Sequence, residues 1–170
     1  MTGKGAMMAR LMGAGVIAGI CVAGPVSAFA ADLPKTGKFE FISCLAGKQN
    51  EIVHGPNHVV GTADTLGTQR SNPPGALFDL TSSRCISSYS YVDGKYAVDG
   101  FWEFLDAQGD TYLLKFNRPP GQPGALDGLH GTGKYSGMKL RGEYDRIAAF
   151  PATPGNTHAC VKATGSFGFQ

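Results

Sequence analysis

The chain has 170 residues, a formal net charge of +2 at pH 7 and only 16% charged residues. This length suits one domain with a single buried core. The low net charge argues against nucleic acid or an anionic membrane surface as a partner, because strongly basic proteins bind both.

Residues 1–30 have the pattern of an export signal. Lys4 and Arg10 supply positive charge, residues 11–24 form an uncharged apolar run, and Ala28-Phe29-Ala30 gives the small-x-small pattern that a signal peptidase cleaves. The run is shorter than the roughly 20 apolar residues of a membrane span. We therefore expect a cleavable signal peptide over 1–30, a single domain over 31–170, and a periplasmic or secreted protein with no membrane span.

Cleavage after Ala30 would change the charge and the cysteine content. The 15 basic residues would lose two, and the 13 acidic residues would then balance them. Cys21 would leave with the signal, and Ile20 before it is not the small residue that a lipoprotein signal needs. Three cysteines would remain, and an oxidising compartment favours pairing two of them.

Turn signals recur about every ten residues over 31–170, and no window keeps the 3.6-residue period of a helix. This spacing is typical of an all-β protein. We expect strands near 37–45, 58–68, 76–80, 84–92, 96–106, 110–117, 134–147 and 159–169. Because closure removes exposed sheet edges, the predicted fold is a small antiparallel β-barrel of about eight strands.

The middle of the chain predicts a double hairpin. Asp93-Gly94 is a strong type I′ turn signal, and it would pair Val92 with Lys95, Tyr89 with Val98, and Cys85 with Trp102. A second turn over 106–110 would pair Phe104 with Tyr112, Trp102 with Leu114, and Gly100 with Phe116. Alternation then places one set of side chains inside the barrel: Cys85, Tyr89, Val98, Trp102, Phe104, Tyr112, Leu114 and Phe116. The outer face would carry charged residues with Phe101, Leu105 and Leu113 among them.

The first and last strands predict a disulfide. Cys44 would end the first strand and Cys160 would begin the last, and these strands are neighbours in a closed barrel. We expect a Cys44–Cys160 disulfide, with Cys85 left as a free, buried thiol. A Cys85–Cys160 pairing is the alternative.

The segment 131–138, Gly-Thr-Gly-Lys-Tyr-Ser-Gly-Met, resembles a glycine motif of the allene oxide cyclase-like barrels. This grouping includes plant allene oxide cyclases, dirigent proteins and many uncharacterised exported bacterial proteins, to which the chain is most similar. The resemblance extends weakly over 37–169. It implies an eight-stranded barrel with a hydrophobic interior, and it transfers no catalytic residue, because none can be matched by position.

The interior aromatic residues are the candidate ligand-binding residues: Tyr89, Trp102, Phe104, Tyr112 and Phe116. An eight-stranded barrel is either just filled by its side chains or holds one small molecule. The alternative is therefore that these residues form a packed core.

Other chemistry has weaker signals. Cys85 has no base beside it in the predicted register, so we expect a structural thiol. The four histidines (His54, His58, His130 and His158) have no spacing that demands a metal, and Asp106 and Asp110 suit a glycine turn. No metal, cofactor or catalytic residue is predicted.

Three functions remain open. The first is a small exported barrel that binds an apolar molecule or is simply a stable extracytoplasmic module. The second is an isomerase or cyclase that acts on a ligand inside the barrel. The third is protein interaction through the outer face near Phe101, Leu105 and Leu113. The sequence does not indicate an oligomeric state.

Overall fold

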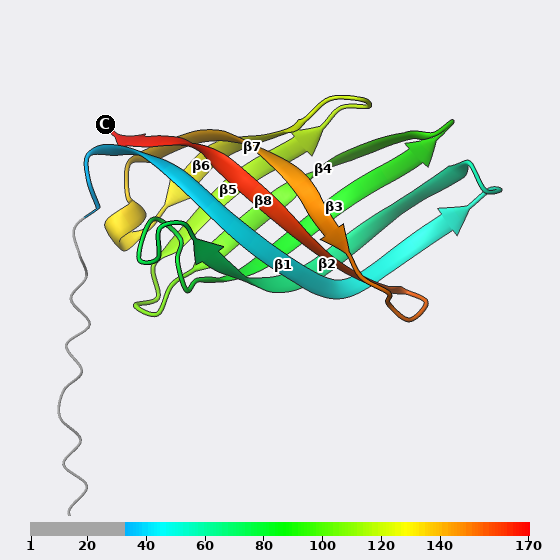
Figure 1. Cartoon of the computed structure of the whole chain (residues 1–170), viewed down its shortest axis with the longest axis horizontal. Helices are drawn as coiled ribbons and strands as arrows, with labels where there is room; N and C mark the ends of the chain where they lie inside the picture. The colour runs from blue at the N-terminus through cyan, green and yellow to red at the C-terminus, as the bar shows by residue number, and fades with distance from the viewer. Residues whose placement is uncertain (1–32) are drawn as a thin grey trace, which may run out of the picture. The chain divides into compact units, whose positions relative to one another are not determined.

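A computed structural model describes residues 33–170, which form a closed barrel of eight antiparallel strands, each paired with its neighbours in chain order (Figure 1). The predicted signal peptide over 1–30 lies outside the described residues. The strands are β1 (Thr36–Val53), β2 (His58–Ser71), β3 (Ser82–Val92), β4 (Lys95–Leu105), β5 (Thr111–Arg118), β6 (Gly124–Gly131), β7 (Met138–Ala149) and β8 (Asn156–Phe169). The predicted all-β barrel is confirmed.

The double hairpin of β3, β4 and β5 has the predicted register. Cys85 pairs with Trp102, and Phe104 pairs with Tyr112. Asp93 and Gly94 have φ angles of 52° and 75°, as a type I′ turn requires. Trp102, Phe104, Tyr112, Leu114 and Phe116 are buried, whereas Phe101 and Leu105 are exposed on the outer face.

One predicted strand was wrong, and one strand of the structure was not predicted. Residues 76–80 are not a strand, because Phe78 and Leu80 take positive φ angles of 66° and 57° that no strand allows. The eighth strand is instead β6, which was not predicted. Its glycine-rich sequence lacks the alternation of apolar and polar residues that indicates a strand. Two of its glycines leave space for aromatic rings. A Cβ at Gly124 would lie 2.2 Å from Tyr144, and one at Gly128 would lie 1.9 Å from the Tyr112 hydroxyl.

The segment 72–81 packs into one end of the barrel. Phe78 is 2% exposed, and its ring stacks on Phe104 with the centroids 4.4 Å apart. Beside it, the buried Gln69 amide donates to the hydroxyls of Ser43 and Ser83 and accepts a hydrogen bond from Thr81. This end of the barrel is therefore filled by a loop whose polar groups are paired. We call it the closed end.

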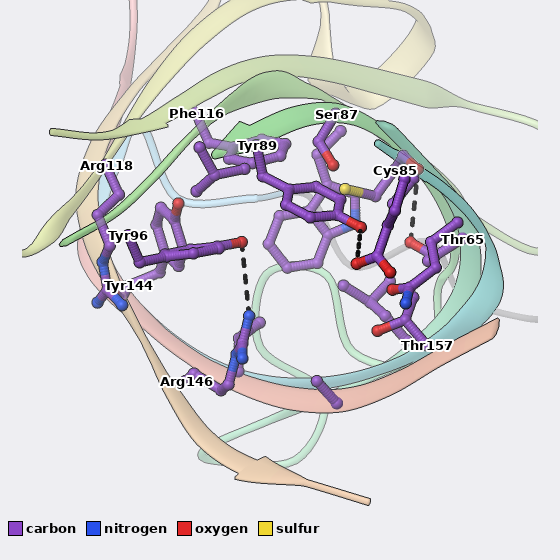
Figure 2. Close-up of a pocket in the computed structure, with 18 residues that line it drawn as sticks. Thr65, Cys85, Ser87, Tyr89, Tyr96, Phe116, Arg118, Tyr144, Arg146 and Thr157 are labelled. Carbon is purple, nitrogen blue, oxygen red and sulfur yellow. Dashed lines mark hydrogen bonds between the residues drawn. The ribbon is translucent and has the colours of Figure 1, made fainter. Parts of the chain in front are cut away.

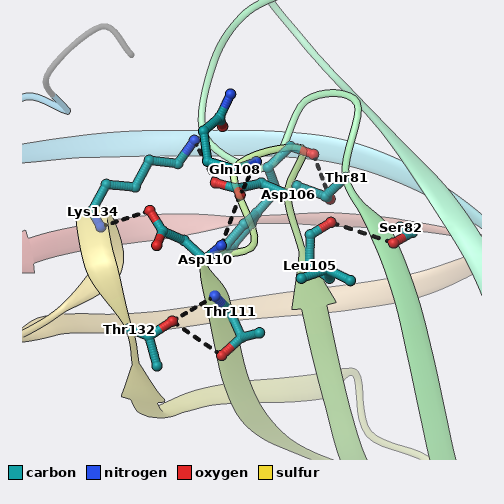
Figure 3. A network of polar contacts seen from close by, with 10 residues as sticks. Thr81, Ser82, Leu105, Asp106, Gln108, Asp110, Thr111, Thr132 and Lys134 are labelled. Carbon is teal, nitrogen blue, oxygen red and sulfur yellow. Dashed lines mark hydrogen bonds and ion pairs between the residues drawn. The ribbon is translucent and has the colours of Figure 1, made fainter.

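A polar network ties two turns together at the same end (Figure 3). The Lys134 ammonium lies 2.8 Å from Asp106 Oδ2, and the Lys134 backbone N–H donates to Asp110. Thr132 accepts a hydrogen bond from the Thr111 backbone N–H. The glycine motif at 131–138 supplies the turn before β7, with positive φ at Gly133 and Gly137, so β7 begins at Met138 and not at the predicted residue 134.

A disulfide joins Cys44 and Cys160, as predicted, and Cys85 is a free, buried cysteine. Cys44 pairs directly with Cys160 in the β1–β8 register. The prediction that Cys44 ends the first strand was wrong, because β1 continues to Val53. The second half of β1 carries Gln49 and Glu51 on the inner face. Because these inward positions are polar, the sequence pattern did not indicate that the strand continues. No helix within residues 33–170 is long and apolar enough to cross a membrane.

Candidate functional site

A cavity of about 290 Å³ lies inside the barrel toward the end opposite the closed end (Figure 2). The four loops that connect β1 to β2, β3 to β4, β5 to β6 and β7 to β8 surround this end, and we call it the mouth. The cavity exists because several inward positions carry small side chains: Ala63, Thr65, Ser87, Thr157 and Ala159. The lining also carries aromatic rings, among them Trp102, Phe116 and Tyr144.

The floor and walls of the cavity are mainly apolar. Trp102 and Phe116 are buried, with ring centroids 6.4 Å apart in an edge-on arrangement, and Phe116 meets Tyr144 edge-on at 5.7 Å. Val98 and Val161 add aliphatic surface, and the Cys85 thiol lies in the same lining. An apolar molecule that entered here would exchange water for ring faces and methyl groups.

Two tyrosines reach into the space that the strands enclose near the mouth, as Figure 2 shows. The rings of Tyr89 and Tyr96 lie 6.3 Å apart. Tyr89 donates a hydrogen bond of 2.8 Å to Glu51 on β1. Arg146 on β7 donates a long hydrogen bond of 3.5 Å to the Tyr96 hydroxyl from across the barrel. These two contacts partly bridge the opening.

Arg118 and Tyr144 form a second polar group in the cavity wall. The guanidinium carbon of Arg118 lies 5.4 Å from the centre of the Tyr144 ring. The same guanidinium donates to the Tyr144 carbonyl at 3.2 Å and forms an ion pair with Asp145. These contacts hold the end of β5 against β7.

Three polar atoms in the lining have no hydrogen-bond partner among the described residues. They are Trp102 Nε1, Arg118 Nε and Tyr144 Oη, and each is shielded from solvent. An unpaired buried polar atom costs stability, so native proteins keep few of them. All three belong to residues that line one cavity, but the atoms themselves are covered and do not face the open space.

Burial raises the pKa of the thiol and of tyrosine hydroxyls in the wall, so these groups are neutral at pH 7. It raises the pKa of the Cys85 thiol to about 12. Burial is also the main reason that the pKa values of Tyr144 and Tyr89 lie above the ordinary value for tyrosine, and the nearby Glu51 raises that of Tyr89 further. Cys85 is therefore a thiol and not a thiolate, which agrees with a structural role.

The cavity includes three of the five predicted ligand-binding residues. Tyr89, Trp102 and Phe116 line it, whereas Phe104 and Tyr112 pack against Phe78 toward the closed end. Whether any of the five contacts a ligand stays a prediction.

Sequence reasoning missed five further lining residues that matter chemically: Glu51, Tyr96, Arg118, Tyr144 as a cavity residue, and Arg146. Strict alternation along the predicted strands could have found Tyr96, which shares a face with Trp102, and Arg146, which shares one with Tyr144. Arg118 lies one residue beyond the predicted strand 110–117.

The predicted turn residues and histidines lie elsewhere. Asp106 and Asp110 belong to the network at the closed end. His58 lies 3.4 Å from Asp93, and His158 stacks on Phe150. Within residues 33–170, no three histidine, cysteine or acidic side chains are placed to hold a metal ion.

No family model matches this chain, and no curated protein matches it. Among solved structures, the barrel is similar to that of the pterocarpan synthase dirigent protein GePTS1, with 12% sequence identity and a TM-score of 0.47, over 80% of this chain and 92% of that one. A likeness this weak supports no statement about ligand or activity.

Proposed function

We propose that this protein binds a small apolar or aromatic molecule inside its barrel. The observation that carries the proposal is the cavity of about 290 Å³ walled by Trp102, Phe116 and Tyr144, next to a closed end that is fully packed. Ligand pockets in proteins usually measure roughly 300–1,000 Å³. The cavity is at the lower limit of that range, so its ligand is small.

The chain contains its own reporter for this proposal. Trp102 is the only tryptophan among the 170 residues, and it lines the cavity. A ligand that enters should shift or quench the tryptophan fluorescence with saturable dependence on its concentration. Native mass spectrometry of protein purified from its own host would identify a ligand that stays bound. A fluorescence signal that no apolar compound alters would contradict the proposal.

Two alanines on β8 give a matched pair of variants. Ala159 lines the cavity, whereas Ala163 is fully buried in the core. We expect Ala159→Leu to occupy cavity volume, to leave the fold intact and to weaken ligand binding about tenfold or more. Ala163→Leu adds the same atoms to packed surroundings, and overpacking of this kind costs about 1–3 kcal/mol.

Titration calorimetry and urea unfolding of both variants would separate the two effects. Unchanged binding by the Ala159→Leu protein would contradict the assignment of this cavity as the binding site.

We further propose that the protein works in the periplasm or is secreted. The Cys44–Cys160 disulfide supports this location, because such bonds form and persist in oxidising compartments. The intact mass of protein from its own host tests the proposal. A chain that begins at Ala31 is the expected result, and a chain that retains residues 1–30 would contradict it.

The second candidate is an isomerase or cyclase that acts on the bound molecule. Ionisable groups inside the cavity favour it, namely Glu51, Arg118 and Tyr144. The buried, uncharged Tyr144 hydroxyl has no partner and could donate a hydrogen bond to an oxygen that gains charge during a rearrangement. The ligand recovered from native protein would be added to ligand-free protein and analysed by chiral chromatography. An unchanged ligand would reject this candidate.

A further inference from the structure

The charged groups of the cavity lining are mainly hydrogen-bond donors. Trp102 Nε1 and Arg118 Nε can only donate, and neither has an acceptor among the described residues. Tyr144 Oη, also without a partner there, can donate as well. The one carboxylate in the lining, Glu51, already accepts a hydrogen bond from Tyr89. Among the charged and the unpaired buried groups of the lining, donors therefore outnumber acceptors, whereas the Gln49 amide and the hydroxyls of Thr65, Ser87 and Thr157 can both donate and accept.

The charges at the mouth show the same imbalance. Arg118 and Arg146 are the two cations of the lining, against Glu51 as its single anion. Arg118 forms an ion pair with Asp145. Arg146 has no ion pair within residues 33–170, and its only polar side-chain contact there is the 3.5 Å hydrogen bond to Tyr96.

Each of the two guanidinium groups lies over the ring of a different tyrosine in the lining. Arg118 lies 5.4 Å from the centre of the Tyr144 ring, and Arg146 lies 5.3 Å from that of Tyr96. Both arginines are near the mouth ends of their strands: Arg118 is the last residue of β5, and Arg146 precedes the end of β7 at Ala149. Figure 2 shows their side chains beside the Tyr96 ring.

We propose that the ligand carries an anionic head group that only accepts hydrogen bonds, such as a carboxylate, and that Arg118 and Arg146 bind it at the mouth. This inference rests on the proposed binding function and specifies the ligand class. The apolar body lies deeper, against Trp102 and Phe116. Guanidinium groups suit this task, because they bind carboxylates through charge-assisted hydrogen bonds that are stronger than neutral ones.

Three probes that share one apolar body test the head group. They are 1-adamantanecarboxylate, 1-adamantanemethanol and 1-adamantylammonium. The carboxylate only accepts hydrogen bonds, the hydroxyl both donates and accepts them, and the ammonium only donates them. They do not fluoresce, so Trp102 fluorescence and titration calorimetry can both follow binding. We expect the carboxylate to bind about tenfold tighter than the ammonium, with the alcohol between them.

Matched variants on β7 locate the head group. Arg146 lines the cavity, whereas Arg141 is exposed on the outer face, where it lies 3.6 Å from Asp127. We expect Arg146→Gln to weaken the carboxylate probe about tenfold and to leave the alcohol probe within about twofold. Arg141→Gln should change neither affinity by more than about twofold, because its exposed ion pair contributes little.

The possible outcomes are distinguishable. If the alcohol and carboxylate bind and the ammonium binds equally well or better, the head-group proposal is overturned and the binding function stands. Equal loss of carboxylate affinity in the Arg146→Gln and Arg141→Gln proteins would also overturn it. If none of the three probes binds, the proposed binding function itself is contradicted.

Discussion

Tyr112 and Tyr144 are both buried tyrosines on the inner face of the barrel, but only one has a partner for its hydroxyl. Tyr112 Oη donates to the Met138 carbonyl at 3.2 Å, whereas Tyr144 Oη has no partner among the described residues. The same side chain therefore has a bonded hydroxyl at one position and an unpaired hydroxyl at the other.

Tyrosine-to-phenylalanine variants should separate these roles. Tyr112→Phe removes a buried hydrogen bond, and we expect it to lower the free energy of unfolding by about 1 kcal/mol. Tyr144→Phe removes an unpaired buried hydroxyl, so stability should stay constant or rise. Urea unfolding measures both. A Tyr144→Phe protein less stable than the Tyr112→Phe protein would show that the Tyr144 hydroxyl has a structural partner.

Cys85 predicts how stability changes at alkaline pH. Burial raises the pKa of its thiol from the ordinary value of 9.0 to about 12. The unfolded chain loses this proton near pH 9 and the folded protein near pH 12, so the free energy of unfolding falls as the pH rises between these values. Buried tyrosines act in the same direction. We expect the free energy of unfolding to fall less over this pH range in the Cys85→Ala protein than in the wild type. Urea unfolding at a series of pH values measures the difference.

At the scale of elements, β6 depends on glycine to leave space for tyrosine. A Cβ at Gly128 would lie 1.9 Å from the Tyr112 hydroxyl oxygen, whereas the nearest atom to a Cβ at Gly168 would be 3.4 Å away. We expect Gly128→Ala to destabilise the protein by about 1–3 kcal/mol and Gly168→Ala to cost much less. Thermal or urea unfolding measures the difference.

A double variant checks the cause. Adding Tyr112→Phe to Gly128→Ala removes the closest clashing atom, so the two changes together should cost less than their sum. Strict additivity would mean that the clash with Tyr112 is not the reason for the loss.

The sequence predicted elements well where one face of a strand is apolar and the other polar. The register of β3, β4 and β5 follows from alternation and from the Asp93-Gly94 turn. Alternation fails where the surroundings of a strand change its residue types. The second half of β1 has polar residues on both faces because it lines the mouth, and β6 has glycines in place of apolar side chains.

The segment 76–80 shows the opposite problem, because apolar residues were predicted as a strand where the structure has a loop. Leu77 and Phe78 are buried like strand residues, but they fill the closed end from a loop. Burial of single side chains therefore does not distinguish a short strand from a loop that inserts into a core. The cavity was predictable only in part, because its volume depends on small side chains from strands that are far apart in the sequence.

For the whole molecule, the Cys44–Cys160 disulfide links the strands that close the barrel. The two residues are 116 positions apart, so the bond closes a long loop in the unfolded chain. In the chain-entropy model, removing such a bond costs about 4–5 kcal/mol. We expect this loss in the Cys44→Ser/Cys160→Ser protein by urea unfolding.

Reduction provides the control for this prediction. A reductant should lower the stability of the wild type to the level of the double serine variant and should leave that variant unchanged. Equal stability of the oxidised and reduced wild type would show that strand pairing alone holds β1 and β8 together.

The even number of strands brings both ends of the described chain to the closed end, where Thr36 pairs with Gly168 (Figure 1). Among the residues that the structure describes, the mouth is bordered by hairpin loops over 54–57, 93–94, 119–123 and 150–155. Loop insertions and substitutions at the mouth can therefore be made without disturbing the packed half. For the same reason, a tether attached at Gln170 would immobilise the protein on a sensor surface with its opening facing the solution.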